Sequence, residues 1–225
     1  MKKNYLILTL LILFSGIFLF NELMSSPQEN NQEKQQDDQV KKFLDSMRDE
    51  WSDWNVPYSD GKILYDLIIE NNYTSALEIG TSTGHSGIWI AWALSKTGGR
   101  LITIEINEDR YREAINNFEQ AGLSPYIDAR LADAHELVKE LEGPFDFVFC
   151  DADKGWYKNY FIDVYPNLAV GGCYTAHNVS LSAGGKVFGS GAAELYAYIK
   201  NLPGLETTVD NSGAGISISY KRAEK

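Results

Sequence analysis

Residues 75–95 read SALEIGTSTGHSGIWIAWALS: a short apolar segment, a glycine-containing loop and a longer apolar segment. Residues 75–79 are typical of a buried β-strand, and residues 86–95 are typical of a helix. Gly80 and Gly84 lie between the two and permit a tight turn and a close approach of the backbone to a ligand. The stretch predicts a strand–loop–helix unit of an α/β protein.

The same alternation extends in both directions from this unit. Two helices precede it, at 40–54 and from Ser59, and the predicted strands and helices after it are strands 101–105, 126–131, 145–150, 173–176, 206–210 and 215–220, and helices 107–122, 134–141, 156–168 and 192–201. The last two strands follow each other across a short turn and predict an antiparallel hairpin. We therefore expect an α/β fold with a doubly wound, mostly parallel seven-stranded sheet and a C-terminal antiparallel hairpin.

Composition narrows the range of partners. The 225 residues carry 20 Lys and Arg against 31 Asp and Glu, a net charge of −11. Such a chain repels phosphate backbones, so we expect no nucleic-acid partner. The two cysteines are Cys150 and Cys173. If Asp151 lies level with His177, Cys150 lies level with Ala176 and Cys173 is about 10 Å lower, which argues against a disulfide.

Ligands of doubly wound sheets bind at the carboxyl ends of the strands, so the residues just after each strand are informative. The loop after the first strand is spaced G-x-x-x-G-x-x-G, which differs from the dinucleotide pattern G-x-G-x-x-G. Glu105 follows the second strand, and a carboxylate there can accept hydrogen bonds from both hydroxyls of a ribose. Asp133 and Ala134 follow the third strand and could flank an adenine ring, while Asp133 could also cap the next helix.

The densest set of reactive side chains follows the fourth and fifth strands. Asp151-Ala-Asp-Lys154 comes after the fourth strand and His177-Asn178 after the fifth. The side chains of Asp151, His177 and Asn178 form a set that suits a divalent metal, although His177 could equally be a hydrogen-bonded histidine without metal. Lys154 is a candidate proton acceptor or an exposed lysine at the start of a helix.

These motifs together resemble a known family. The pattern E-x-G-x-x-x-G at 78–84, the acid at 105, D-A-D-K at 151–154, Y-x-x-Y at 157–160, G-G at 171–172 and H-N at 177–178 are similar to the S-adenosylmethionine-dependent O-methyltransferases of the caffeoyl-CoA and catechol type. The resemblance implies a class I methyltransferase-like Rossmann fold and methyl transfer from S-adenosylmethionine to a hydroxyl of a small, catechol-like acceptor. The cofactor-binding residues it implies are Glu78, Gly80, Gly84, His85, Ser86, Glu105, Asp133, Ala134 and Asp151.

The resemblance also implies catalytic and metal-binding residues. Lys154 corresponds to the lysine proposed as the base in that family, and Asp151 belongs to the catalytic pair with it. The family binds a divalent cation through the first Asp of D-A-D-K and an Asp-Asn pair, which here is His177-Asn178. The change from Asp to His removes a negative charge, which disfavours Mg²⁺ or Ca²⁺ and favours a transition metal or no metal.

The acceptor side is less defined by the sequence. The aromatic candidates for stacking against an acceptor, which could instead be core or rim residues, are Trp54, Tyr58, Trp156 and Tyr157. Trp89 and Trp92 lie on the helix after the glycine loop and are expected to pack in the core. Residues 179–190 are rich in Gly and Ser and predict a mobile loop over the acceptor site.

Two other functions stay open. One is a nicotinamide-dependent oxidoreductase on a similar sheet, which the loop spacing and the terminal hairpin disfavour. The other is a membrane-tethered protein that binds the cofactor without turnover. Assembly into a homodimer is also left open.

The N-terminus forms a separate segment. Lys2 and Lys3 precede an apolar run over residues 5–20, which predicts a membrane anchor or, alternatively, a signal peptide with export after cleavage. We divide the chain into an anchor or signal segment at 1–24, a solvated polar linker at 25–39 and the domain at 40–225. The positive-inside rule puts the domain outside the cytoplasm, whereas S-adenosylmethionine is made in the cytosol, so the side of the membrane stays open.

Overall fold

A single mixed sheet organises the protein. The computed structural model describes residues 27–51 and 54–223, and its strands are β1 (Ser75–Ile79), β2 (Arg100–Glu105), β3 (Ile127–Leu131), β4 (Phe145–Cys150), β5 (Leu168–His177), β6 (Leu205–Asp210) and β7 (Ile216–Lys221). Their order in the sheet is β3-β2-β1-β4-β5-β7-β6. Strands β1 to β5 are parallel, and β7 runs antiparallel to both β5 and β6. The predicted doubly wound, mostly parallel sheet with a C-terminal antiparallel hairpin is confirmed.

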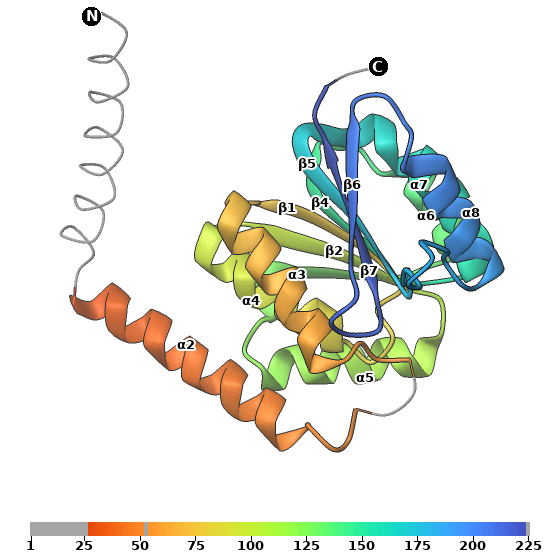
Figure 1. Cartoon of the computed structure of the whole chain (residues 1–225). Helices are drawn as coiled ribbons and strands as arrows, with labels where there is room; N and C mark the ends of the chain where they lie inside the picture. Colours follow the sequence, from red (N-terminus) through yellow and green to blue (C-terminus); the bar gives the residue numbers. More distant parts are fainter. Residues whose placement is uncertain (1–26, 52–53, 224–225) are drawn as a thin grey trace, which may run out of the picture.

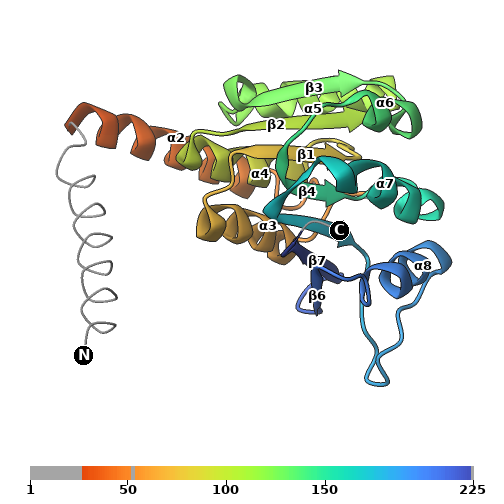
Figure 2. The same cartoon turned by 90° about the horizontal axis from the view of Figure 1, so that it is seen from above.

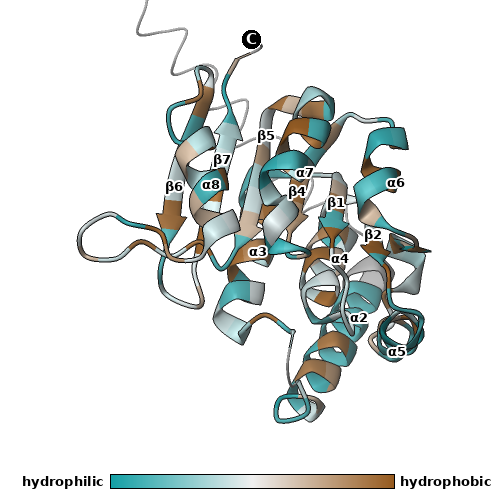
Figure 3. Cartoon of the chain, turned by 90° about the vertical axis from the view of Figure 1, so that its right-hand side faces the viewer, coloured by the Kyte–Doolittle hydropathy of each residue, from teal (hydrophilic) through white to brown (hydrophobic). Residues whose placement is uncertain are grey.

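Helices cover both faces of this sheet (Figures 1 and 2). The helices are α2 (Pro27–Ser46), α3 (Tyr58–Asn71), α4 (His85–Thr97), α5 (Glu108–Gln120), α6 (Ala134–Glu140), α7 (Tyr157–Val164) and α8 (Ser190–Ile199). Helices α2 to α5 contribute to one buried cluster and α6 to α8 to another. Figure 3 shows that α5 is mainly hydrophilic, whereas β4 and β5 carry hydrophobic residues.

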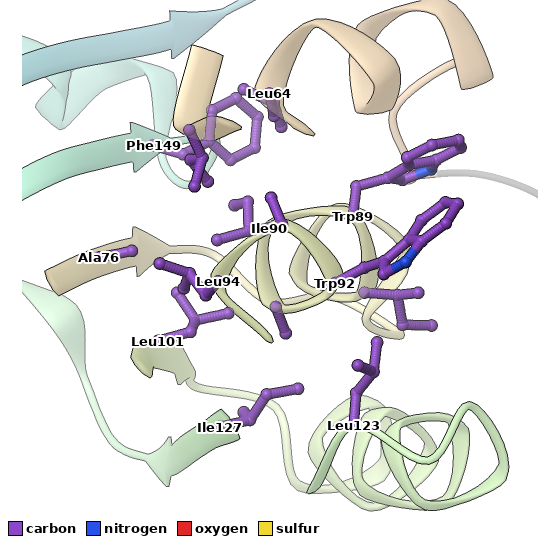
Figure 4. Close-up of a cluster of buried hydrophobic side chains, with 14 of the residues drawn as sticks. Leu64, Ala76, Trp89, Ile90, Trp92, Leu94, Leu101, Leu123, Ile127 and Phe149 are labelled. Carbon is purple, nitrogen blue, oxygen red and sulfur yellow. The ribbon is translucent and has the colours of Figure 1, made fainter. Parts of the chain in front are cut away.

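The period-2 alternation of strand side chains produces the two clusters. Phe147 and Phe149 of β4 point into the cluster under α3 and α4, and Val148 and Cys150 into the cluster under α6 to α8. Trp89 and Trp92 of α4 belong to the first cluster (Figure 4), so their predicted packing role is confirmed. Because both faces of β4 are buried, its sequence is apolar at every position except Asp146.

The order of strands reverses between β1 and β4. From β1 the chain proceeds to β2 and β3 on one side, then returns to place β4 beside β1 and continues through β5. The loops after β1 and β4 therefore diverge to opposite faces, which opens a crevice at the carboxyl ends of these strands.

The structure corrects the linker predicted at 25–39. Helix α2 begins at Pro27 and continues to Ser46, so most of that segment is helical. Asp37 accepts a hydrogen bond from the Trp92 indole at 2.7 Å and pairs with Lys96 at 2.6 Å. The segment carries few apolar residues, and the contacts described here are polar ones, which hydrophobic periodicity does not detect.

Smaller differences concern element ends. Strand β5 begins at Leu168, five residues before the predicted start, and α7 ends at Val164. Helix α3 begins at Tyr58, one residue before its predicted start at Ser59. Cys150 pairs in register with Ala176, as predicted, and both cysteines are buried and free.

The N-terminal segment at 1–24 lies outside the described residues. Within residues 27–51 and 54–223, every helix is too short or too polar to cross a membrane.

Candidate active site

The carboxyl ends of the central strands lie at one level. Ile79 is the register partner of both Ile104 and Cys150, and Cys150 is the partner of Ala176. The residues that follow these positions therefore surround one crevice. A cavity of about 630 Å³ occupies it, and the predicted site residues that line it are Gly80, Glu105, Asp133, Ala134, Asp151, Lys154, His177 and Asn178.

Gly80 allows β1 and β4 to approach each other at this cavity. Its φ of 99° is in the left-handed region, and a Cβ on it would lie 2.6 Å from the carbonyl oxygen of Asp151. A side chain at this position would both strain the backbone and clash with it. The absence of a side chain at Gly80 therefore determines how closely the chain after β1 approaches the backbone of Asp151 at the cavity.

Glu105 presents a fixed carboxylate at the end of β2. Its two oxygens accept hydrogen bonds from the backbone amides of Ser82, at 2.8 Å, and Asn107, at 2.9 Å. Each carboxylate oxygen keeps a second lone pair, so Glu105 can still accept hydrogen bonds from a ligand. The glycine loop thus orients the acid toward the cavity.

Glu78, Gly84, His85 and Ser86 do not line the cavity. Glu78 is fully buried and its Oε2 accepts a hydrogen bond from Thr103 at 2.6 Å. Burial raises the pKa of Glu78 to about 8, although hydrogen bonds from Ser86 and Thr103 act in the opposite direction. Gly84, with φ of 98°, precedes the first residue of α4. These four residues therefore belong to the glycine loop and the elements next to it, without facing the cavity.

His85 lies in an aromatic cluster on the far side of that loop. Its Nδ1 donates to the carbonyl oxygen of Val56 at 2.8 Å, and its Nε2 accepts from the Trp89 indole at 3.1 Å. Its ring stacks on Trp51 with 4.6 Å between ring centroids. This pattern requires the neutral imidazole, and burial lowers the pKa of His85 to about 4, despite the hydrogen bond to Val56.

Several cavity residues were not predicted from the sequence. Ile106 is 66% exposed beside Glu105, and His135 stacks on Tyr160 with 5.5 Å between centroids. Asp133 caps α6 by accepting from the amide of His135 at 2.9 Å and also faces the cavity, so both of its predicted roles are compatible with its position. The position of Ile106 directly after Glu105 is the signal that could have identified it.

The four aromatic acceptor candidates lie in different environments. Trp54 is 74% exposed, lines the cavity and packs against the Arg110 guanidinium at 5.3 Å. Tyr58 instead packs against His85 and Trp89, and Tyr157 is buried. Trp156 contacts the His135 ring edge-on. Of these four aromatic residues, Trp54 lines the cavity and the other three do not.

A cluster of four charged side chains lies where β4 and β5 end, and three of its members, Asp151, Lys154 and His177, line the cavity. Asp151 pairs through Oδ1 with Lys154 and, through Oδ2, with Nδ1 of His177 at 3.0 Å. The other ring nitrogen of His177, Nε2, lies 2.9 Å from Oδ2 of Asp60. Lys154 also donates to the Tyr157 hydroxyl at 2.6 Å. Asp60 was not predicted from the sequence, because its partner His177 lies 117 residues away.

Burial and charge set the protonation of this cluster. Burial alone would lower the pKa of His177, but the hydrogen bonds to Asp151 and Asp60 outweigh it and raise that pKa to about 9. Asp60 is completely buried, and although burial opposes its charge, hydrogen bonds from His177, Ala214 and Ser59 hold its pKa below the ordinary value. Asp60 is therefore a carboxylate and His177 an imidazolium.

Comparison with known proteins identifies the family. A profile of the O-methyltransferase family matches residues 28–198. The chain belongs to the O-methyltransferase family. The chain is 40% identical over 111 residues to a catechol O-methyltransferase of Niastella koreensis, covering 48% of this chain and 50% of that relative. It is 30% identical over 155 residues to caffeoyl-CoA O-methyltransferase 1 of Eucalyptus globulus, covering 67% of this chain and 62% of that relative. The chain thus spans between half and about three-fifths of the length of these curated relatives.

Solved structures of O-methyltransferases have the same fold. A Bacillus cereus O-methyltransferase in complex with SAH has a TM-score of 0.69 and 26% identity, over 82% of this chain and 90% of that one. The O-methyltransferase TomG of Streptomyces achromogenes has a TM-score of 0.69 and 23% identity, over 93% of this chain and 96% of that one. The predicted class I methyltransferase fold is therefore confirmed.

The divalent cation implied by the O-methyltransferase family does not fit the residues present. Both ring nitrogens of His177 face carboxylate oxygens, so the ring has no lone pair directed at a metal. In the described part of the chain, no group of three His, Cys, Asp or Glu side chains is arranged to hold a metal ion. Asn178 lines the cavity, but its expected partners Asp151 and His177 are paired with each other.

Proposed function

We propose that this O-methyltransferase family member transfers the methyl group of S-adenosylmethionine to a hydroxyl of a small acceptor. The observation that carries the proposal is that one cavity is lined by Gly80, Glu105 and Lys154. Gly80 follows β1, Glu105 ends β2 and Lys154 comes shortly after β4. The SAH complex of the related Bacillus cereus protein supports this choice of cofactor. Bound S-adenosylmethionine would supply an electrophilic methyl group on sulfur.

Different walls of the cavity suit different parts of the ligands. The carboxylate of Glu105 would accept hydrogen bonds from ribose hydroxyls, and Ile106, Ala134 and His135 offer surfaces for an adenine ring. Gly80 would let the amino-acid end approach the backbone. The acceptor would lie beside Lys154 and Asp151, with Trp54 as the aromatic side chain available for stacking.

The chain has two tasks in the reaction that we propose. The first is to align the acceptor oxygen with the methyl group, because an in-line approach lowers the barrier mainly by positioning. The second is to remove the hydroxyl proton, for which Lys154 is the candidate acceptor once it has released its own proton to solvent, with Asp151 as its positioning partner. With S-adenosylmethionine bound, transfer would form the oxygen–carbon bond as the carbon–sulfur bond breaks, and the bonding electron pair would stay on sulfur.

Calorimetric titration of the full chain with S-adenosylmethionine and with NAD tests the cofactor, and transfer of labelled methyl to a panel of phenols tests turnover. We expect binding of S-adenosylmethionine only, followed by transfer. NAD binding would favour the oxidoreductase, and cofactor binding without transfer to any acceptor would favour the protein without turnover.

Lys154→Met tests the assignment of the proton acceptor. We expect kcat to fall by roughly 10²–10⁴-fold with cofactor affinity unchanged. Lys158→Met is the matched control, because Lys158 pairs with Glu194 on α8 and does not line the cavity. Equal activities of the two variants would refute the role of Lys154.

Membrane attachment through residues 1–24 remains a proposal from the sequence. An anchor predicts that the full-length chain stays with membranes after an alkaline wash, and a signal peptide predicts a shortened mature N-terminus by mass spectrometry. Homodimer formation also remains a prediction, which sedimentation of the full chain would test.

A further inference from the structure

The four charged side chains Asp60, Asp151, Lys154 and His177 are paired with one another where α3 meets the ends of β4 and β5. His177 lies between two carboxylates, with Nδ1 at 3.0 Å from Asp151 and Nε2 at 2.9 Å from Asp60. Asp151 holds Lys154 through its other oxygen. His177 and Asp60 have side chains that are 5% and 0% exposed, so water contributes little to balancing their charges.

The geometry determines the protons on His177. A carboxylate oxygen only accepts hydrogen bonds when ionised, so a ring nitrogen beside it must carry hydrogen. Both ring nitrogens of His177 are beside carboxylates, which makes the ring an imidazolium with two donors in use. A metal would have to displace one of these protons and break a charge-assisted hydrogen bond.

The charges within the cluster are already balanced. Asp60 and Asp151 contribute two negative charges, and His177 and Lys154 contribute two positive ones. A divalent cation that displaced one His177 proton would leave one uncompensated positive charge beside the buried side chains of His177 and Asp60, which is unfavourable. A carboxylate in place of His177 would lower the charge of the cluster by two and make room for such a cation.

We propose that His177 is a positioning residue whose imidazolium stands in for a divalent metal, so that this chain transfers methyl groups without one and needs a single acceptor hydroxyl. The second half of this inference, methyl transfer to a single acceptor hydroxyl without a metal, rests on the proposed function. Its first half, the exclusion of a metal, concerns the free protein and can be measured without turnover.

The class of acceptor follows from how many oxygens the Lys154 ammonium can hold in place of a metal. A bound metal ion can hold two neighbouring oxygens at once and so selects vicinal diols. The ammonium of Lys154 is a compact point charge that lines the cavity and can hold one oxygen. The acceptors we expect are therefore small phenols with one hydroxyl as well as catechols, with the second hydroxyl contributing little.

Mn²⁺ titration followed by electron paramagnetic resonance tests the first half. The full chain, with S-adenosylmethionine present, is compared with His177→Asp and with the near-isosteric neutral control His177→Asn. We expect no saturable binding to the unaltered chain, and binding to His177→Asp that is more than about tenfold tighter than to His177→Asn. Circular dichroism verifies that each variant is folded.

Two results would overturn the metal exclusion. Saturable, stoichiometric Mn²⁺ binding by the unaltered chain would show that the cluster opens to admit a metal. Equal Mn²⁺ affinities of folded His177→Asp and His177→Asn would show that the charge at this position is not what excludes it. The titration of the unaltered chain is decisive even if a variant does not fold.

Methyl transfer tests the second half. After dialysis against EDTA, we expect unchanged rates, and a rate with phenol within about tenfold of that with catechol. EDTA inactivation that Mn²⁺ reverses, or transfer confined to catechols, would overturn it. Absence of transfer to every acceptor would refute the proposed function, whereas the Mn²⁺ titration would still decide the metal exclusion.

Discussion

Replacing His85 with asparagine should remove a specific acid-dependent loss of stability. In the folded protein, the ring is neutral because it donates to Val56 and accepts from Trp89, and its pKa is about 4. In the unfolded chain, the same ring takes up a proton below pH 6.5. Between these two values the unfolded state binds more protons than the folded state, so stability falls as the pH falls.

The size of the effect follows from the two pKa values. Each pH unit below 6.5 costs the folded state about 1.4 kcal/mol until pH 4 is reached. At pH 5, His85 therefore contributes a loss of about 2 kcal/mol relative to neutral pH. The amide of asparagine can still donate to the Val56 carbonyl but cannot take up a proton, so His85→Asn should lack this loss.

Urea unfolding of the full chain at pH 7 and pH 5, followed by circular dichroism, measures the effect. The quantity compared is the change in the free energy of unfolding between the two pH values, since other titrating groups contribute equally to both proteins. A pH dependence of His85→Asn equal to that of the unaltered chain would refute the reasoning.

Three further predictions concern Gly80 beside the Asp151 backbone, Glu105 in the proposed cofactor site and Asp37 in helix α2. Gly80→Ala should lower the free energy of unfolding by more than about 2 kcal/mol and abolish titratable cofactor binding, because its Cβ would lie 2.6 Å from a backbone oxygen. Glu105→Gln should weaken S-adenosylmethionine binding by roughly 10–100-fold in calorimetry, with little change in urea midpoint; unchanged affinity would contradict the ribose assignment. Asp37→Ala should cost about 1 kcal/mol in urea unfolding by leaving the Trp92 indole unpaired, while cofactor affinity stays the same.

The predictable part of the structure is the part governed by local patterns. Strand-length apolar runs and glycine turns define the succession of strands along the chain, and residues at or directly after the carboxyl ends of those strands, such as Glu105 and Asp151, lie at the cavity because parallel strands end together. Asn107, where the predicted helix 107–122 begins, caps α5, since its side chain accepts from the amide of Arg110.

The parts that sequence reasoning missed depend on contacts distant in the chain. Asp60 becomes part of the site only because folding brings α3 to the end of β5. The N-terminal half of α2 gives no apolar signal, and the Asp37 pairing to α4 cannot be inferred from periodicity. His177 was identified as a site residue, but its state follows from two carboxylates, of which one was unknown.

Asp60 also accepts a hydrogen bond from the amide of Ala214, in the turn between β6 and β7, at 3.0 Å. One buried carboxylate therefore ties together the beginning of the domain, the end of β5 and the last hairpin. A chain still emerging from the ribosome cannot complete this junction until its final strands have left the exit tunnel. Products of premature termination before residue 214 should therefore lack an ordered reaction centre even where the central sheet has formed.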